Sequence, residues 1–108
     1  MQAHYPARFE REMGCTEAEL LAWLPGALRG RSHRLAPGQV EMPLGAGRMT
    51  LHWQTLEPRR IALMCIPRLA VQFTFEQVDE AERQAFMRFF DLYTQLSLIH
   101  ISEPTRPY

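Results

Sequence analysis

The stretch MTLHWQTLEPRRIALMCIPRLAVQFTF, from Met49 to Phe75, decides the fold, because apolar and polar residues alternate in its first and last parts. A period of two is the pattern of a β-strand with one buried face. Two proline-containing pairs, Glu57-Pro58 and Pro67-Arg68, divide the stretch, and we expect a turn at each. The sequence therefore predicts three antiparallel strands, at residues 49–54, 60–66 and 69–75.

The middle predicted strand, 60–66, is almost entirely apolar after Arg60, which is typical of a central strand covered on both faces. If both turns contain an even number of residues, Trp53 lies opposite Arg60 and both side chains belong to the apolar face. A bulge at Pro67 would move part of the chain to the other face, so that alternative stays open. A charged side chain on an apolar face is costly, which makes Arg60 the most unusual feature of the sequence.

Further strands are expected on the N-terminal side of this stretch. Val40, Met42 and Leu44 alternate with Glu41, and the glycine-rich segment 45–47 supplies a turn into the next strand. Residues 7–13 fit either a strand or a helix. The strand is favoured because Gly14 then breaks the chain.

Two helices are predicted from capping boxes, in which an N-cap side chain and the third helical residue bond each other's backbone. Thr16 and Glu19 mark the first helix, which Pro25 should stop or kink. Asp79 and Glu82 mark the second, whose apolar stripe should cover the sheet. The predicted fold is α+β, an antiparallel four- to five-stranded sheet with an N-terminal helix and a long C-terminal helix packed on one face. The stripe consists of Phe86, Phe89, Phe90 and Tyr93.

The chain has 108 residues, of which 46 % are hydrophobic, and its 12 basic and 12 acidic residues give a formal net charge of zero. This length suits one domain, and the lack of a basic excess argues against nucleic acid and anionic membranes as partners. Its apolar runs are far shorter than the roughly 20 residues of a membrane helix. No apolar signal segment is present and two cysteines are too few for a disulfide framework, so we expect a cytoplasmic protein.

The last thirteen residues, LSLIHISEPTRPY at 96–108, differ in composition and hold two of the four isoleucines. Leu96 to Arg106 resemble, without a mismatch, the translated end of a transposase-based sequencing adapter. We therefore expect a single domain at residues 1–95, followed by a non-native, adapter-derived tail at 96–108. The alternative is a genuine short strand at 98–101 with a proline-rich end.

The order of the predicted elements resembles that of a shortened helix-grip domain, with a strand, a broken helix pair, a meander and a long C-terminal helix. Helix-grip domains hold apolar ligands between the sheet and the last helix, so the resemblance implies a pocket there, although their sheets normally have more strands. Residues 1–95 also resemble a small bacterial family without an assigned activity. The matching segments are CTEAE (15–19), WLP (23–25), PRRIAL (58–63) and FDLY (90–93).

Candidate catalytic and metal-binding residues are few. The histidines do not stand at ligand spacing with cysteines or acids, so we predict no metal site and no cofactor. Cys15 precedes a helix N-terminus, where a thiolate is stabilised, but packing against Leu20 is the favoured explanation, and a thiol enzyme is the least favoured function. A basic cluster could bind phosphate or an acidic partner, although a solvated loop paired with Glu41 or Glu57 is favoured. This cluster consists of Arg29, Arg31, His33 and Arg34.

These patterns favour a binding domain over an enzyme. The first hypothesis is a pocket for a small apolar or amphipathic ligand between the sheet and the C-terminal helix, with Arg60 and Trp53 at its mouth. Arg60 would hold an anionic head group, or else lie at the sheet edge or stack on Trp53. The second hypothesis is a protein-interaction or homodimerisation domain that uses Ile61, Leu63 and Cys65 as its contact surface.

Overall fold

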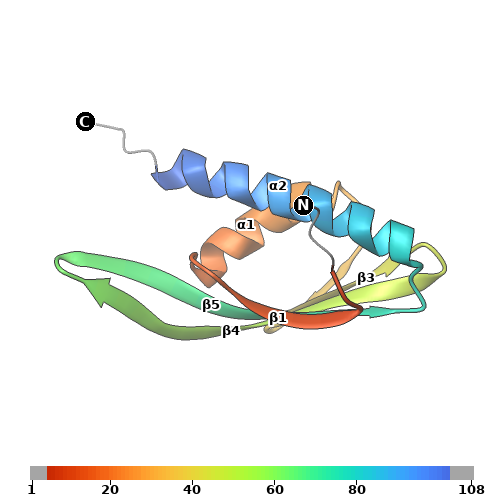
Figure 1. The fold of residues 1–108 in the computed structure, drawn as a ribbon, viewed down its shortest axis with the longest axis horizontal. Coiled ribbons are helices and arrows are strands. Elements are labelled where there is room, and N and C mark those ends of the chain that lie inside the picture. Colours follow the sequence, from red (N-terminus) through yellow and green to blue (C-terminus); the bar gives the residue numbers. More distant parts are fainter. Residues whose placement is uncertain (1–4, 103–108) are drawn as a thin grey trace.

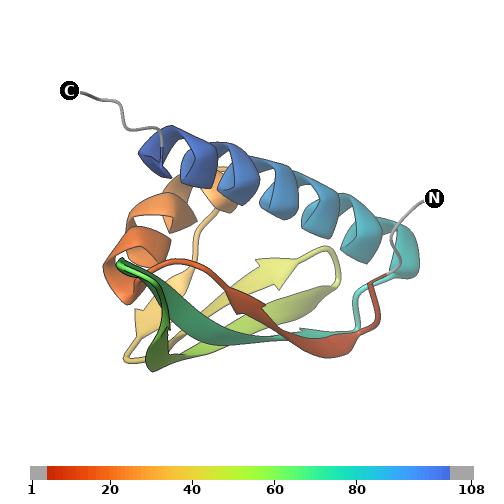
Figure 2. The same ribbon diagram turned by 60° about the vertical axis from the view of Figure 1, so that its left-hand side comes forward.

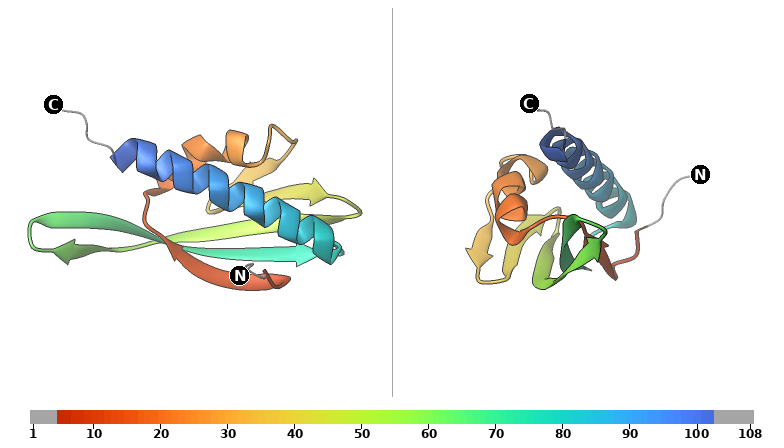
Figure 3. Two further views of the ribbon diagram at one scale, coloured as in Figure 1. Left: turned by 45° about the horizontal axis from the view of Figure 1, so that its top comes forward. Right: turned by 90° about the vertical axis from the view of Figure 1, so that its left-hand side faces the viewer.

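The computed structural model describes residues 5–102 and the side-chain surroundings of residues 5–97. One antiparallel sheet has the strand order β1-β5-β4-β3-β2, and both helices lie on the same face of it (Figures 1 and 3). The predicted α+β fold is confirmed, with five strands, an N-terminal helix and a long C-terminal helix. The elements are β1 (Arg8–Met13), α1 (Glu17–Ala27), β2 (Arg34–Ala36), β3 (Gln39–Leu44), β4 (Gly47–Ile61), β5 (Met64–Glu76) and α2 (Glu80–Ser102).

The inner face of the sheet shares one apolar core with α1 and α2 (Figure 2). The predicted alternation holds for β4 up to Trp53 and for β5 from Leu69, where every second side chain is buried. From α2, Phe86, Met87 and Phe90 enter the core, and Phe90 meets Phe73 edge-on at 5.3 Å between ring centroids. Burial of each such side chain is worth about 1.5–3 kcal/mol, so this layer holds the fold together.

The first helix begins as predicted and ends later than predicted. Thr16 and Glu19 form the capping box, with the Thr16 hydroxyl 3.1 Å from the Glu19 backbone nitrogen. The helix continues through Pro25 to Ala27, because a proline in the last turn removes only one hydrogen bond. At Gly26, α1 passes so close to α2 that an added Cβ would lie 2.1 Å from the Tyr93 hydroxyl oxygen.

The prediction of a separate strand at 60–66 is wrong. β4 runs through Pro58 and β5 runs through Pro67, and the chain turns at residues 62–63 instead. Pro58 is accommodated by a register shift between Leu56 and Arg59, and prolines are tolerated at bulges and on exposed strand edges. Ala62 makes the turn with a φ of 55°, a conformation for which glycine is the usual choice.

The end of this long hairpin projects beyond both helices (Figures 1 and 3). We call residues 57–68 the hairpin arm. Its tip exposes three large apolar side chains, those of Ile61, Leu63 and Met64, and the Leu63 side chain is fully exposed. The apolar run that resembled a buried central strand therefore lies mostly in solvent.

The second helix continues from Gln95 through the adapter-like residues to Ser102, so the alternative of a short strand at 98–101 is wrong. Thr94 is the last buried residue of α2 among those with described side chains. Up to residue 97, the burial of α2 therefore ends just before the boundary predicted at residue 95.

Candidate ligand-binding cavity

The structure does not bring the two predicted site residues together. Trp53 pairs with Val71 and Arg60 pairs with Cys65, so the predicted opposition of Trp53 and Arg60 is wrong. Both lie on β4, and at the rise of a strand their seven-residue separation is roughly 23 Å. The reason is the missing turn at Glu57-Pro58, without which the chain does not fold back at that point.

Trp53 instead joins the sheet to the first helix. Its side chain is largely buried, and its indole Nε1 donates a hydrogen bond of 2.8 Å to Glu17 Oε2 in the first turn of α1. Arg60 is exposed on the hairpin arm and has no ion-pair partner among the described residues.

The space between the sheet and α2 is mostly filled by core side chains, among them Phe73 and Phe90. A cavity of about 150 Å³ is left where the end of α1, the end of β3 and the N-terminal half of α2 meet. An apolar cavity of this size holds a group as large as a benzene ring. Its lining residues are Ala27, Leu28, Arg29, Arg31, Leu44, Glu82, Ala85, Phe86 and Phe89.

A strained turn places the arginines at this cavity. Arg29 and Gly30 follow α1 with φ values of 58° and 69°, so the chain passes through two left-handed residues in succession. Such a φ costs an arginine about 1 kcal/mol or more. The Arg29 guanidinium lies 4.0 Å from the centroid of the Phe89 ring, a cation–π contact that offsets part of this cost.

The cavity lining carries charges of both signs. Arg29 and Arg31 come from the loop after α1, and Glu82 comes from the first turn of α2. Within residues 5–97, none of these three side chains forms an ion pair. The positions suit the helix dipoles, because cations are favoured beyond a helix C-terminus and anions at an N-terminus.

Glu82 is the site residue that the sequence did not identify. It was predicted to complete a capping box with Asp79, but no hydrogen bond joins its carboxylate to the Asp79 backbone in the described chain. Its carboxylate lies instead against the β3–β4 turn, where a Cβ added to Gly45 would be 2.2 Å from Glu82 Oε1. A glutamate three residues after Asp79 fits a capping box as well as a cavity wall, so only the tertiary packing shows that Glu82 lines the cavity.

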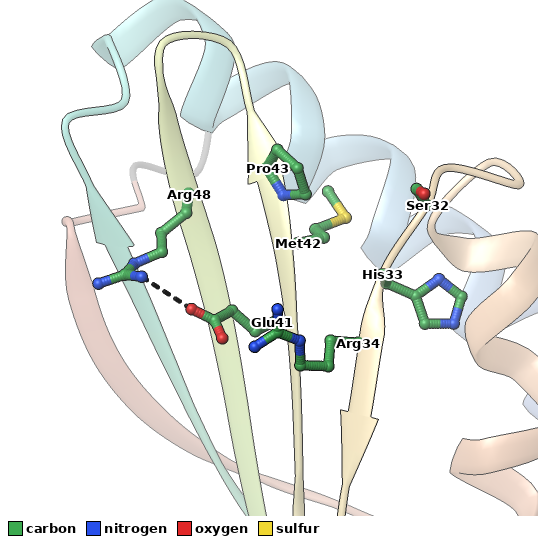
Figure 4. A pocket seen from close by; sticks show the side chains of 7 residues that line it. All are labelled: Ser32, His33, Arg34, Glu41, Met42, Pro43 and Arg48. Atoms are coloured by element: carbon green, nitrogen blue, oxygen red, sulfur yellow. Dashed lines mark hydrogen bonds and ion pairs between the residues drawn. The ribbon is translucent and has the colours of Figure 1, made fainter.

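The predicted basic cluster is divided between two places. Arg29 and Arg31 line the cavity, whereas His33 and Arg34 line a broader surface groove of about 470 Å³ along β2 and β3 (Figure 4). In this groove, Arg48 rather than the cluster pairs with Glu41, at 2.9 Å. The other lining residues of the groove are Ser32, Met42 and Pro43.

Cys15 is buried, and this burial, together with the charge of Glu19, raises the pKa of its thiol to about 11. A thiol that stays protonated at neutral pH is a poor nucleophile, which opposes the thiol-enzyme hypothesis. No group of three or more His, Cys, Asp or Glu side chains within the described chain is placed to hold a metal ion.

Comparisons with known proteins do not assign the chain to a family. No model of a protein family matches it, and no curated protein matches its sequence significantly. Among the helices that the structure describes, none is long and apolar enough to cross a membrane. The fold and the cavity together define a small α+β domain with a pocket between its two helices and the end of β3.

Proposed function

We propose that this protein is a non-catalytic binding domain for a small ligand with an apolar body and a charged head. The single observation that carries the proposal is the cavity between α1, β3 and α2, whose lining combines apolar side chains with charged ones that form no ion pair within residues 5–97. A ligand of this kind would cover the apolar wall and would give those charges partners. Arg29 and Arg31 take the role that the sequence suggested for Arg60.

The size of the cavity limits both the ligand and its affinity. A group of four carbons fits a space of 150 Å³, and each buried CH₂ contributes about 0.8 kcal/mol. The resulting gain of about 3 kcal/mol is partly lost to the entropy of association. A dissociation constant of 1 mM requires about 4 kcal/mol, so we expect dissociation constants in the millimolar range or weaker, which sets the concentrations for a binding test.

Thermal unfolding of the full chain with 4-methylpentanoate, a branched anion, tests the proposal. At about 10 mM, binding to the folded state should raise Tm, because a ligand stabilises the state that binds it. Ala85→Phe places a ring at the cavity and should remove the rise, while Ala81→Phe, one turn earlier on the same helix and outside the lining, should retain it. An equal rise in Ala85→Phe, or no rise in the parent chain, would contradict the proposal.

A second candidate function rests on the hairpin arm. Strand alternation places Ile61, Met64 and Ile66 on one face of the arm, so its exposed apolar groups form a patch rather than scattered points. Pro58 and Pro67 stand one on each strand and disfavour pairing of the arm with a further strand. Contact through side chains is then the way in which the arm would bind a partner.

For this second candidate we propose a second copy of the chain as the partner. A twofold arrangement in which the apolar tips of two arms pack against each other would remove Ile61, Leu63 and Met64 from solvent. Sedimentation velocity over a range of concentrations should then show a dimer that Leu63→Ser removes. A monomer at every concentration would contradict this candidate and leave the cavity as the binding site.

We also propose that residues 1–95 are the native domain and that residues 96–108 come from adapter sequence. The proposal is supported by the burial pattern of α2, in which no residue from 95 to 97 is buried. Sequencing of the source DNA past codon 95 tests it, and an uninterrupted native frame through codon 108 would overturn it. The bacterial origin and the cytoplasmic location stay predictions.

A further inference from the structure

We infer that the ligand is a small apolar α-amino acid, held by its carboxylate at Arg29 and Arg31 and by its ammonium group at Glu82. The inference deepens the proposed function and rests on it. Its basis is the combination of both signs of charge with one apolar cavity.

Separate structural elements hold the opposite charges apart. Arg29 is fixed by the left-handed turn and by its stacking on Phe89. Glu82 is placed by α2 and lies against Gly45. Neither arginine comes within the 4.0 Å of Glu82 that would form an ion pair, so these charges do not neutralise each other directly.

A ligand with a single charge would fit this arrangement poorly. A simple carboxylate would meet the arginines but would be repelled by Glu82, and a simple amine would meet Glu82 but would be repelled by the arginines. A zwitterionic head has both groups within a few bonds of each other, and it gives each protein charge a partner of opposite sign. The arrangement therefore favours an amino acid over either of its singly charged analogues.

The apolar wall selects the side chain of that amino acid. Leu28, Leu44 and Phe86 are buried and offer no side-chain hydrogen-bond partner. A polar side chain would lose its hydration there without compensation. The volume of about 150 Å³ admits an isobutyl or a similar group, so L-leucine is the probe of matching size.

Isothermal titration calorimetry of the full chain at low salt, with three matched probes, tests the inference. L-Leucine is compared with 4-methylpentanoate, which lacks the ammonium group, and with 3-methylbutylamine, which lacks the carboxylate. We expect L-leucine to bind about 10-fold more tightly than either analogue, the effect of one additional charge-assisted contact.

Two variants assign the contacts to residues. Glu82→Gln should weaken L-leucine and the amine about 10-fold and leave 4-methylpentanoate no weaker, while Arg31→Gln should weaken L-leucine and the carboxylate and leave the amine no weaker. Arg34→Gln removes an equal charge at the start of β2, three residues after Arg31 and outside the cavity lining, and should leave all three affinities unchanged.

Different results would overturn the amino-acid inference and the proposed ligand-binding function. If 4-methylpentanoate binds as tightly as L-leucine and Glu82→Gln weakens neither, the amino-acid inference is overturned while the proposed function stands. If none of the three probes binds, or if Ala85→Phe binds them as well as the parent chain does, both are overturned.

Discussion

Asp91 ties the N-terminal part of the chain to α2. Its Oδ1 accepts a hydrogen bond of 2.8 Å from Arg11 Nη2, and its Oδ2 accepts one of 2.6 Å from the Tyr5 hydroxyl. The Arg11 guanidinium also lies 5.2 Å from the centroid of the Phe73 ring, so it sits against the core. The hydrogen bond to Asp91 is the main cause of the raised pKa of Tyr5, followed by burial.

Asp91→Asn should lower the free energy of unfolding by about 1–2 kcal/mol at pH 7, because it leaves the half-buried Arg11 without its charged partner. Because the folded-state pKa of Tyr5 lies above the ordinary value of 10.0, the stability contribution of Tyr5 is complete below pH 10 and is lost as the pH rises further. Urea unfolding at pH 7 and above pH 10 checks both effects. Glu10→Gln, an exposed change on β1, is the control, and equal stability of both variants would contradict the role of Asp91.

The two cysteines should differ sharply in reactivity. Cys15 is buried with its pKa raised to about 11, whereas Cys65 is exposed on the hairpin arm. At pH 8, iodoacetamide should therefore alkylate Cys65 and leave Cys15 unmodified in the folded protein, and denaturation should expose both. Peptide mass spectrometry measures this, and rapid alkylation of Cys15 in the folded chain would restore the thiol-enzyme hypothesis.

At the scale of elements, the sequence predicted those parts of the fold that local signals mark. The capping box at Thr16 and the turn at Gly45 are local, and both are present. The hairpin turn at Ala62 carries no glycine or asparagine, while the two prolines, which usually mark turns, lie inside strands. The predicted site failed with the hairpin, because the proximity of Arg60 to Trp53 depended on a turn that does not form.

The cavity could not be predicted from local sequence signals either. Arg29 and Arg31 were visible in the sequence as part of a basic cluster, but the cavity wall comes from three elements that are distant along the chain. Glu82 had a sufficient local explanation as a capping residue. Its position beside Gly45 depends on how α2 packs over the β3–β4 turn, which no local pattern encodes.

Removal of residues 96–108 should change the stability of the domain little. Among the α2 side chains that the structure describes, the last buried one is that of Thr94, and Leu96 is exposed. Surface changes of this kind usually alter the free energy of unfolding by no more than about 0.5 kcal/mol. Thermal unfolding of residues 1–95 beside the full chain checks this, and a loss of several kcal/mol would show that the tail belongs to the folded domain.

At the scale of the whole molecule, the two candidate binding sites, the cavity and the hairpin arm, lie far apart. The domain is elongated, with extents of 46 × 29 × 25 Å, because the hairpin arm projects from one end (Figure 1). The two sites lie at opposite ends of β4. Leu44 of the cavity lining pairs with Gly47, the first residue of β4, whereas the tip of the arm follows Ile61, the last residue of β4. A ligand in the cavity and a partner on the arm would therefore affect different sets of residues.

The central claim, that the cavity is the binding site, is tested most directly by residue-resolved chemical-shift mapping. The ¹⁵N-labelled chain is titrated with L-leucine and, separately, with 4-methylpentanoate. The account predicts saturable shifts at the amides of Leu28, Arg31, Leu44 and Ala85, and none at Leu63 on the arm. Shifts confined to the hairpin arm, or the absence of saturable shifts with either compound, would contradict it.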